Sequence, residues 1–85
     1  MKQKVLNYTA VFQKEPDGGY TVFVPMLPGC VSYGEDLEEA KKMINEAIEL
    51  YIESLSEHKE EIPTEENIFY SQININPSKL NTSYA

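Results

Sequence analysis

The stretch "VPMLPGCVSYGEDLEEA", residues 24–40, determines how this chain passes from strands to a helix. It starts as the apolar end of a strand and turns at Pro28-Gly29, where proline fixes φ and glycine permits a tight turn. The single cysteine of the chain, Cys30, follows the turn directly. The stretch is therefore either a reactive site, with Cys30 as nucleophile, or a structural corner.

The second half of the stretch has the features of a helix start. The segment "CVSY", residues 30–33, is long enough for a short strand, and Gly34 follows it. Asp36 is a good N-cap, and Glu39 three residues later completes the Asp variant of a capping box. We expect a helix to begin here.

Upstream of the corner, the pattern predicts a β-hairpin. Residues 5–13 and 20–27 are rich in β-branched and aromatic residues, and apolar and polar positions alternate within them. Between them, "PDGG" at residues 16–19 has the composition of a turn. Pro25 cannot donate a ladder hydrogen bond, so regular pairing should weaken there.

Downstream of the corner, apolar residues recur at the three- and four-residue spacing of an amphipathic helix of about 20 residues. This stripe comprises Leu37, Ala40, Ile44, Ala47, Ile48, Tyr51, Ile52 and Leu55. The opposite face is mostly acidic and comprises Glu39, Lys42, Glu46, Glu49, Glu53 and Glu57. A solvated helix surface is the simpler explanation of this face, and a binding surface is the alternative.

The region after the helix predicts one more strand. Pro63 should stop the helix, and "IFYSQINI" at residues 68–75 has strand-like alternation before Pro77 ends it. The predicted fold class is α+β: a β-β-β-α-β layer with one long helix on an antiparallel-dominated sheet. We assign residues 1–76 to one domain and residues 77–85 to a polar, disordered C-terminal tail.

The composition places the chain among small acidic proteins. Of 85 residues, 14 are acidic and 7 are lysine, so the formal net charge is −7. Such a surface repels nucleic-acid phosphates and attracts basic partners. No apolar run reaches the length of a membrane span, and one cysteine cannot form an internal disulfide, so we expect a cytoplasmic protein.

The residues offer no catalytic or metal-binding machinery. His58, the single histidine, follows a predicted helix about 30 Å long whose start lies near Cys30, so we do not expect a Cys-His pair within one chain. One cysteine and one histidine cannot form a structural zinc site, and no calcium loop is present. We therefore predict no catalytic residues, no metal and no cofactor.

In combination, these motifs resemble the HicB-like antitoxin family. The resemblance rests on a "GGY" hairpin, then "P-x-L-PGC-x-S-x-G", then "D-x-EEA" opening a long amphipathic helix, and it spans residues 7–56. The matching residues are Pro25, Leu27, Pro28, Gly29, Cys30, Ser32, Gly34, Leu37, Glu39 and Ala40.

The resemblance implies a reduced ribonuclease H-like layer without catalytic carboxylates. It also implies a non-enzymatic function, namely that the chain binds a small basic HicA-type ribonuclease toxin and blocks its cleavage of mRNA. Typical family members carry a further DNA-binding segment, whereas about ten residues with one lysine follow the last predicted strand here. Direct DNA binding is therefore not expected. The resemblance also implies that the Pro28-Gly29-Cys30 corner is a structural turn.

Three functions remain open at this point. The first is toxin inhibition, with Glu46, Glu49 and Glu53 as partner-binding residues together with exposed strand residues. The second is a residual nuclease or thiol enzyme, whose activity would depend on Cys30, Asp17 or Asp36. The third is a stand-alone oligomeric interaction or regulatory domain with another partner. A homo-oligomer, dimer or tetramer, is expected in each case, because an exposed last strand readily pairs with another copy.

Overall fold

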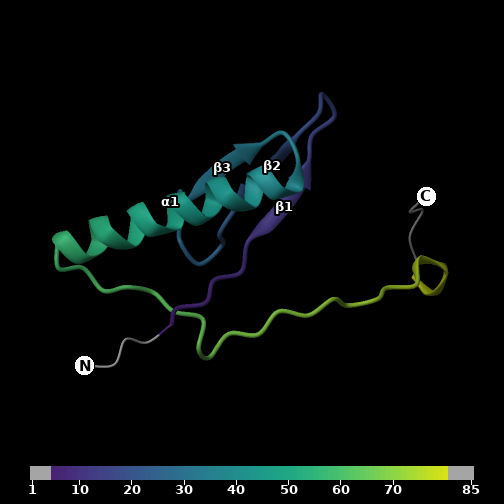
Figure 1. Ribbon diagram of the computed structural model, residues 1–85. Coiled ribbons are helices and arrows are strands. Elements are labelled where there is room, and N and C mark those ends of the chain that lie inside the picture. Colours follow the sequence, from purple (N-terminus) through teal and green to yellow (C-terminus); the bar gives the residue numbers. More distant parts are fainter. Residues whose placement is uncertain (1–4, 81–85) are drawn as a thin grey trace.

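One long helix packs on one face of a three-stranded antiparallel sheet of order β1-β2-β3 (Figure 1). The computed structural model describes residues 5–80. Its elements are β1 (Val11–Lys14), β2 (Tyr20–Phe23), β3 (Val31–Gly34), the helix α1 (Leu37–Glu57) and a short 3-10 helix, η1 (Pro77–Lys79). The predicted α+β class, with its hairpin and single long helix, is confirmed.

The strands of the hairpin are shorter than the sequence predicts. Gly18 and Gly19 close the turn with φ of 105° and 80°, values that favour glycine. The pairing of β1 with β2 ends where Val11 meets Phe23. Beyond that point comes Pro25, which has no N–H for the ladder. Residues 5–10 are therefore not part of the sheet, although we predicted a strand from residue 5.

The Pro28-Gly29-Cys30 corner is a hydrogen-bonded loop. Val24 N donates to Cys30 O at 3.1 Å, and Cys30 N donates to Leu27 O at 2.9 Å. Gly29 has φ of 86°, and the Tyr51 hydroxyl of α1 donates to Pro28 O at 2.8 Å. The loop therefore returns the chain from β2 into β3 and is held against the helix.

Helix α1 begins at the predicted cap. Of the predicted stripe, Ala40 and Ile44 are buried, Leu37 is 52% exposed, and the rest is half-buried. The Asp36 carboxylate accepts from Glu39 N at 2.7 Å. The Glu39 carboxylate reaches back to Glu35 N at 2.6 Å, one residue before the cap. Helix and sheet share a small core comprising Val22, Val24, Leu27, Cys30, Ala40 and Ile44. At its other end, α1 stops at His58 and the chain turns at Lys59, whose φ is 56°.

The chain after the helix follows an unexpected path. It returns to Tyr8 and Thr9 and then runs outward as an extended segment (Figure 1). We call residues 68–76 the arm. The predicted strand over residues 68–75 is not formed, because the arm pairs with no strand of its own sheet. Of the predicted tail, residues 77–79 form η1, and residues 81–85 lie outside the described residues.

Candidate functional site

Three glutamates form an acidic ridge on the outward face of α1. Glu46, Glu49 and Glu53, which we call the acidic ridge, are all exposed and follow helical spacing. No lysine lies between residues 43 and 58, so nothing within this half of the helix offsets their charge. Glu57 extends the same line by one turn. These residues can attract a basic partner without any local rearrangement.

Beside the ridge lies a groove with a mixed apolar and polar lining. It has a volume of about 580 Å³ and separates the segment before β1 from the second half of α1. Its lining comprises the apolar or aromatic residues Leu6, Tyr8, Ile48 and Ile52 and the polar residues Asn45, Glu49 and Glu53. The groove therefore combines exposed apolar surface with two carboxylates of the ridge.

A contact between distant parts of the chain holds the segment before β1, which contributes Tyr8 to the groove. The Glu65 carboxylate accepts from both Thr9 N and Thr9 Oγ1, each at 2.8 Å. The Tyr8 hydroxyl donates to Pro63 O. Burial raises the pKa of Tyr8 above its ordinary value, and the Glu65 charge adds to the rise. The raised pKa favours the protonated phenol, which acts as a hydrogen-bond donor.

Cys30 lies in the core with 4% of its surface exposed. Burial raises the pKa of its thiol, which disfavours the nucleophilic thiolate. His58 is at the far end of α1, where its Nδ1 lies 2.8 Å from Ser54 O. The structure does not bring these two residues together, and Cys30 packs as a small apolar side chain.

The other residues of the predicted motif are structural. A Cβ on Gly34 would lie 2.1 Å from Ala40 N, so β3 and the start of α1 can approach this closely only at a glycine. Asp36 and Glu39 are engaged in capping. Asp17, considered above as a catalytic candidate, is exposed in the hairpin turn. These acids do not converge on a pocket with Cys30.

A second exposed surface lies on the sheet face away from the helix. Val11, Phe23 and Val31 are cross-strand partners in one row, with 37%, 38% and 55% of their surfaces exposed. Tyr33 lies on the same face, is half exposed, and donates from its hydroxyl to Gly18 O at 2.9 Å. These are the exposed strand residues whose identity the sequence analysis left unspecified.

Within residues 5–80, no group of three or more His, Cys, Asp or Glu side chains could hold a metal ion. None of the helices in that range is both long enough and apolar enough to cross a membrane.

The sequence analysis found the ridge but missed the groove. Helical spacing reveals Glu46, Glu49 and Glu53, because neighbours on a helix face are three or four residues apart. The groove brings Leu6 and Tyr8 against Ile48 and Ile52, about 40 residues later in the chain. The apolar residues before β1 are the sequence feature that could have indicated the groove, but their pattern predicts a strand.

Comparison with known proteins gives one family and several relatives. The family model described as the HicB-like antitoxin of bacterial toxin-antitoxin systems matches residues 8–80. A UPF0150 protein of Synechocystis sp. is 52% identical over 66 residues, covering 78% of this chain and 84% of the relative. A UPF0150 protein of Thermoplasma acidophilum is 50% identical over 58 residues, covering 68% and 84%. An uncharacterised 14.9 kDa protein of Haemophilus phage HP1 is 45% identical over 56 residues, covering 66% of this chain and 41% of the phage protein.

Proposed function

The chain belongs to the HicB-like antitoxin family, and on that premise we propose that it is a cytoplasmic antitoxin that binds and blocks a HicA-type mRNA-cleaving toxin. The inhibitor needs no chemistry of its own, since covering the active surface of a ribonuclease is sufficient. The role is non-catalytic, and it requires neither metal nor cofactor.

The acidic ridge is the observation that supports this proposal. A ribonuclease binds the negatively charged backbone of RNA through basic side chains, and an inhibitor can occupy the same side chains with carboxylates. Glu46, Glu49 and Glu53 present three such carboxylates on one rigid helix face. Complementary charge chiefly raises the rate of association and makes that rate sensitive to salt.

The test is to reverse the charge of the ridge. The variant Glu46→Lys/Glu49→Lys/Glu53→Lys should associate with the toxin at least about tenfold more slowly at low salt, because the steering field is lost. Its association rate should also vary less with ionic strength. Stopped-flow or surface-plasmon kinetics with a purified HicA-type toxin would measure both effects.

A matched control separates local from overall charge. Asp17→Lys/Glu60→Lys/Glu61→Lys changes the net charge equally at exposed positions outside the ridge. This control should retain most of the wild-type association rate. Equal slowing of the two variants, or no slowing of the ridge variant, would contradict a role for the ridge as the toxin contact.

We further propose that the βββα body is a reduced ribonuclease H-like fold. It keeps the sheet and the helix of such a nuclease but lacks the catalytic carboxylates. In the structure its strands β1, β2 and β3 carry no Asp or Glu. This body acts as a scaffold for the ridge. Operator DNA is not among the proposed partners of the described residues, given their acidic surface.

A second candidate is a stand-alone oligomeric interaction domain with a different partner. The observation that favours it is the exposed apolar arm, in which Phe69 and Ile73 have 89% and 76% of their surfaces exposed. Co-expression with the neighbouring reading frame distinguishes the two. Co-elution and rescue of growth support the antitoxin, whereas an oligomer that neither binds nor neutralises the toxin supports the second function.

A further inference from the structure

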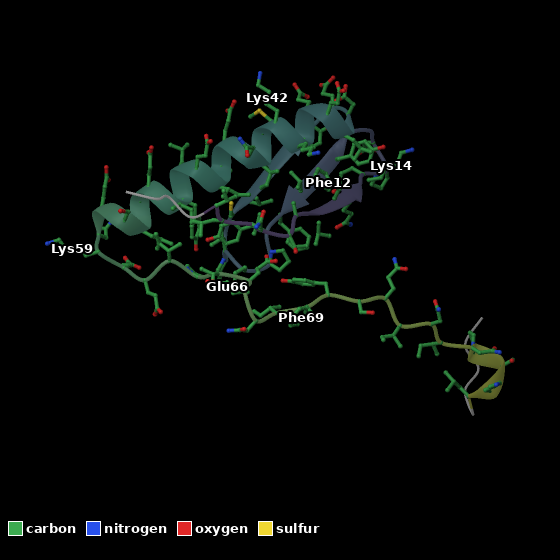
Figure 2. All side chains as sticks on the ribbon, turned by 60° about the horizontal axis from the view of Figure 1, so that its bottom comes forward. Phe12, Lys14, Lys42, Lys59, Glu66 and Phe69 are labelled. Atoms are coloured by element: carbon green, nitrogen blue, oxygen red, sulfur yellow. The ribbon has the colours of Figure 1, made fainter. Side chains whose placement is uncertain are left out.

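The arm has a strand-like sequence but lies apart from any strand of its own chain. Ile73 and Ile75 alternate with polar residues, and Phe69 lies on the same side of an extended chain. These three side chains are 76%, 64% and 89% exposed, in that order. Figure 2 shows Phe69 at the beginning of the arm, which continues away from the sheet and the helix. Residues 67–78 carry no charge, although the whole chain carries −7. Exposed apolar side chains on an uncharged extended segment indicate that the segment packs against something.

The same chain has a free edge that could receive a strand. β1 lies at the edge of the sheet and pairs with β2 alone among the described strands. Along an edge strand of an antiparallel sheet, residues whose backbone groups bond to the neighbouring strand alternate with residues whose backbone groups point outward. Glu15, just beyond the ladder, is of the first kind, because its N donates to Gly19 O. Val11 and Gln13 therefore direct their backbone groups toward β2, and Phe12 and Lys14 direct theirs to the outer edge. Such an edge readily accepts another extended segment.

The groove lies on the side that the apolar face of an added strand would cover. Helix α1 packs on β3 and β2, so the helix-facing side near β1 is less covered. Leu6, Tyr8, Ile48 and Ile52 contribute the apolar part of the lining of the groove. Residues 69–75 span about 23 Å as a strand, which is enough to follow β1 and part of the segment before it.

We propose that the arm of one copy adds as a β-strand to the β1 edge of a second copy, with Phe69, Ile73 and Ile75 packed toward the groove. The exchange is reciprocal: each copy donates its arm and accepts the arm of the other. In one twofold-symmetric dimer, both arms and both β1 edges are therefore paired. The second copy is the favoured occupant because the arm leaves its own body, and donor and acceptor lie on the same chain. An uncharged arm also avoids repulsion from the acidic body of the partner copy.

The donor side is tested with two charged variants of the full chain. In Ile73→Lys/Ile75→Lys, lysines replace the apolar face, and the dimer dissociation constant should rise at least about a hundredfold. The matched control, Gln72→Lys/Asn74→Lys, adds the same charge on the opposite face and should change the constant less than about threefold. All four positions are exposed in the single chain, so neither variant should lose helix content by circular dichroism. Sedimentation velocity measures the association.

The acceptor side is tested at Lys14, whose N–H points outward. Lys14→Pro removes that donor without disturbing the β1–β2 ladder, so this variant should be monomeric. The control Lys14→Ala keeps the N–H and should still dimerise. Mixing Lys14→Pro with Ile73→Lys/Ile75→Lys should restore a dimer held by one arm. A monomeric wild type at 100 µM, or a dimer that persists in both blocked variants, would overturn the proposal. These measurements contain no toxin, so they stand or fall independently of the antitoxin assay.

Discussion

At the scale of single residues, Gly34 determines how closely the helix can approach the sheet. A Cβ there would meet Ala40 N at 2.1 Å and Ala40 Cα at 2.4 Å. Because both atoms belong to the backbone of α1, no side-chain rotation can relieve the clash. The glycine is required by this close approach and not by its own backbone conformation, since its φ is not positive.

We expect Gly34→Ala to lower the free energy of unfolding by about 2 kcal/mol or more, because the first turn of α1 must lift from β3. Urea unfolding followed by circular dichroism measures this loss. Ser32→Ala on the same strand removes only a long hydrogen bond, 3.4 Å from Ser32 Oγ to Met43 O, and should stay within about 0.5 kcal/mol of wild type. Similar stability of the two variants would contradict the steric argument.

At the scale of elements, the start of α1 depends on reciprocal capping. Asp36→Ala removes the acceptor for Glu39 N and should cost about 1 kcal/mol of unfolding free energy. Asp36→Asn keeps an acceptor oxygen and should retain most of the stability. Thermal unfolding of the two variants would show the difference. If Asn were as destabilising as Ala, the carboxylate charge at the helix N-terminus would matter more than the hydrogen bond.

The elements also show which parts of this fold can be predicted from the sequence. The hairpin and α1 have local signals, namely turn glycines, an N-cap and helical periodicity, and both are present. The alternation in residues 68–75 is just as clear, but a strand exists only when a partner edge pairs with it. The strand-forming pattern of the arm is visible in the sequence, whereas the edge that would pair with it is not. For the same reason sequence reasoning found the acidic ridge on one helix and missed the groove between distant segments.

At the scale of the whole molecule, body and arm are separate parts. The radius of gyration is 17.0 Å, whereas a compact domain of this length has one of about 12 Å. The core comes entirely from residues 22–44, and the half-buried residues packed around it extend this range only from Tyr8 to Ile52. Residues 66–80 are all exposed. The arm therefore contributes little to the stability of its own chain.

This separation predicts that the chain shortened to residues 1–67 still folds. It keeps the Thr9–Glu65 contact and every core residue, so its unfolding should remain cooperative, with the helix signal of α1 intact.

In dilute solution the unfolding midpoint of the shortened chain should match that of the full chain. At higher concentration the midpoint of the full chain should rise, because dimerisation through the arm stabilises the folded state by mass action, while that of the shortened chain stays constant. Calorimetry over a hundredfold range of concentration measures both. Loss of cooperative unfolding in the shortened chain would show that residues 68–85 complete the core of their own body.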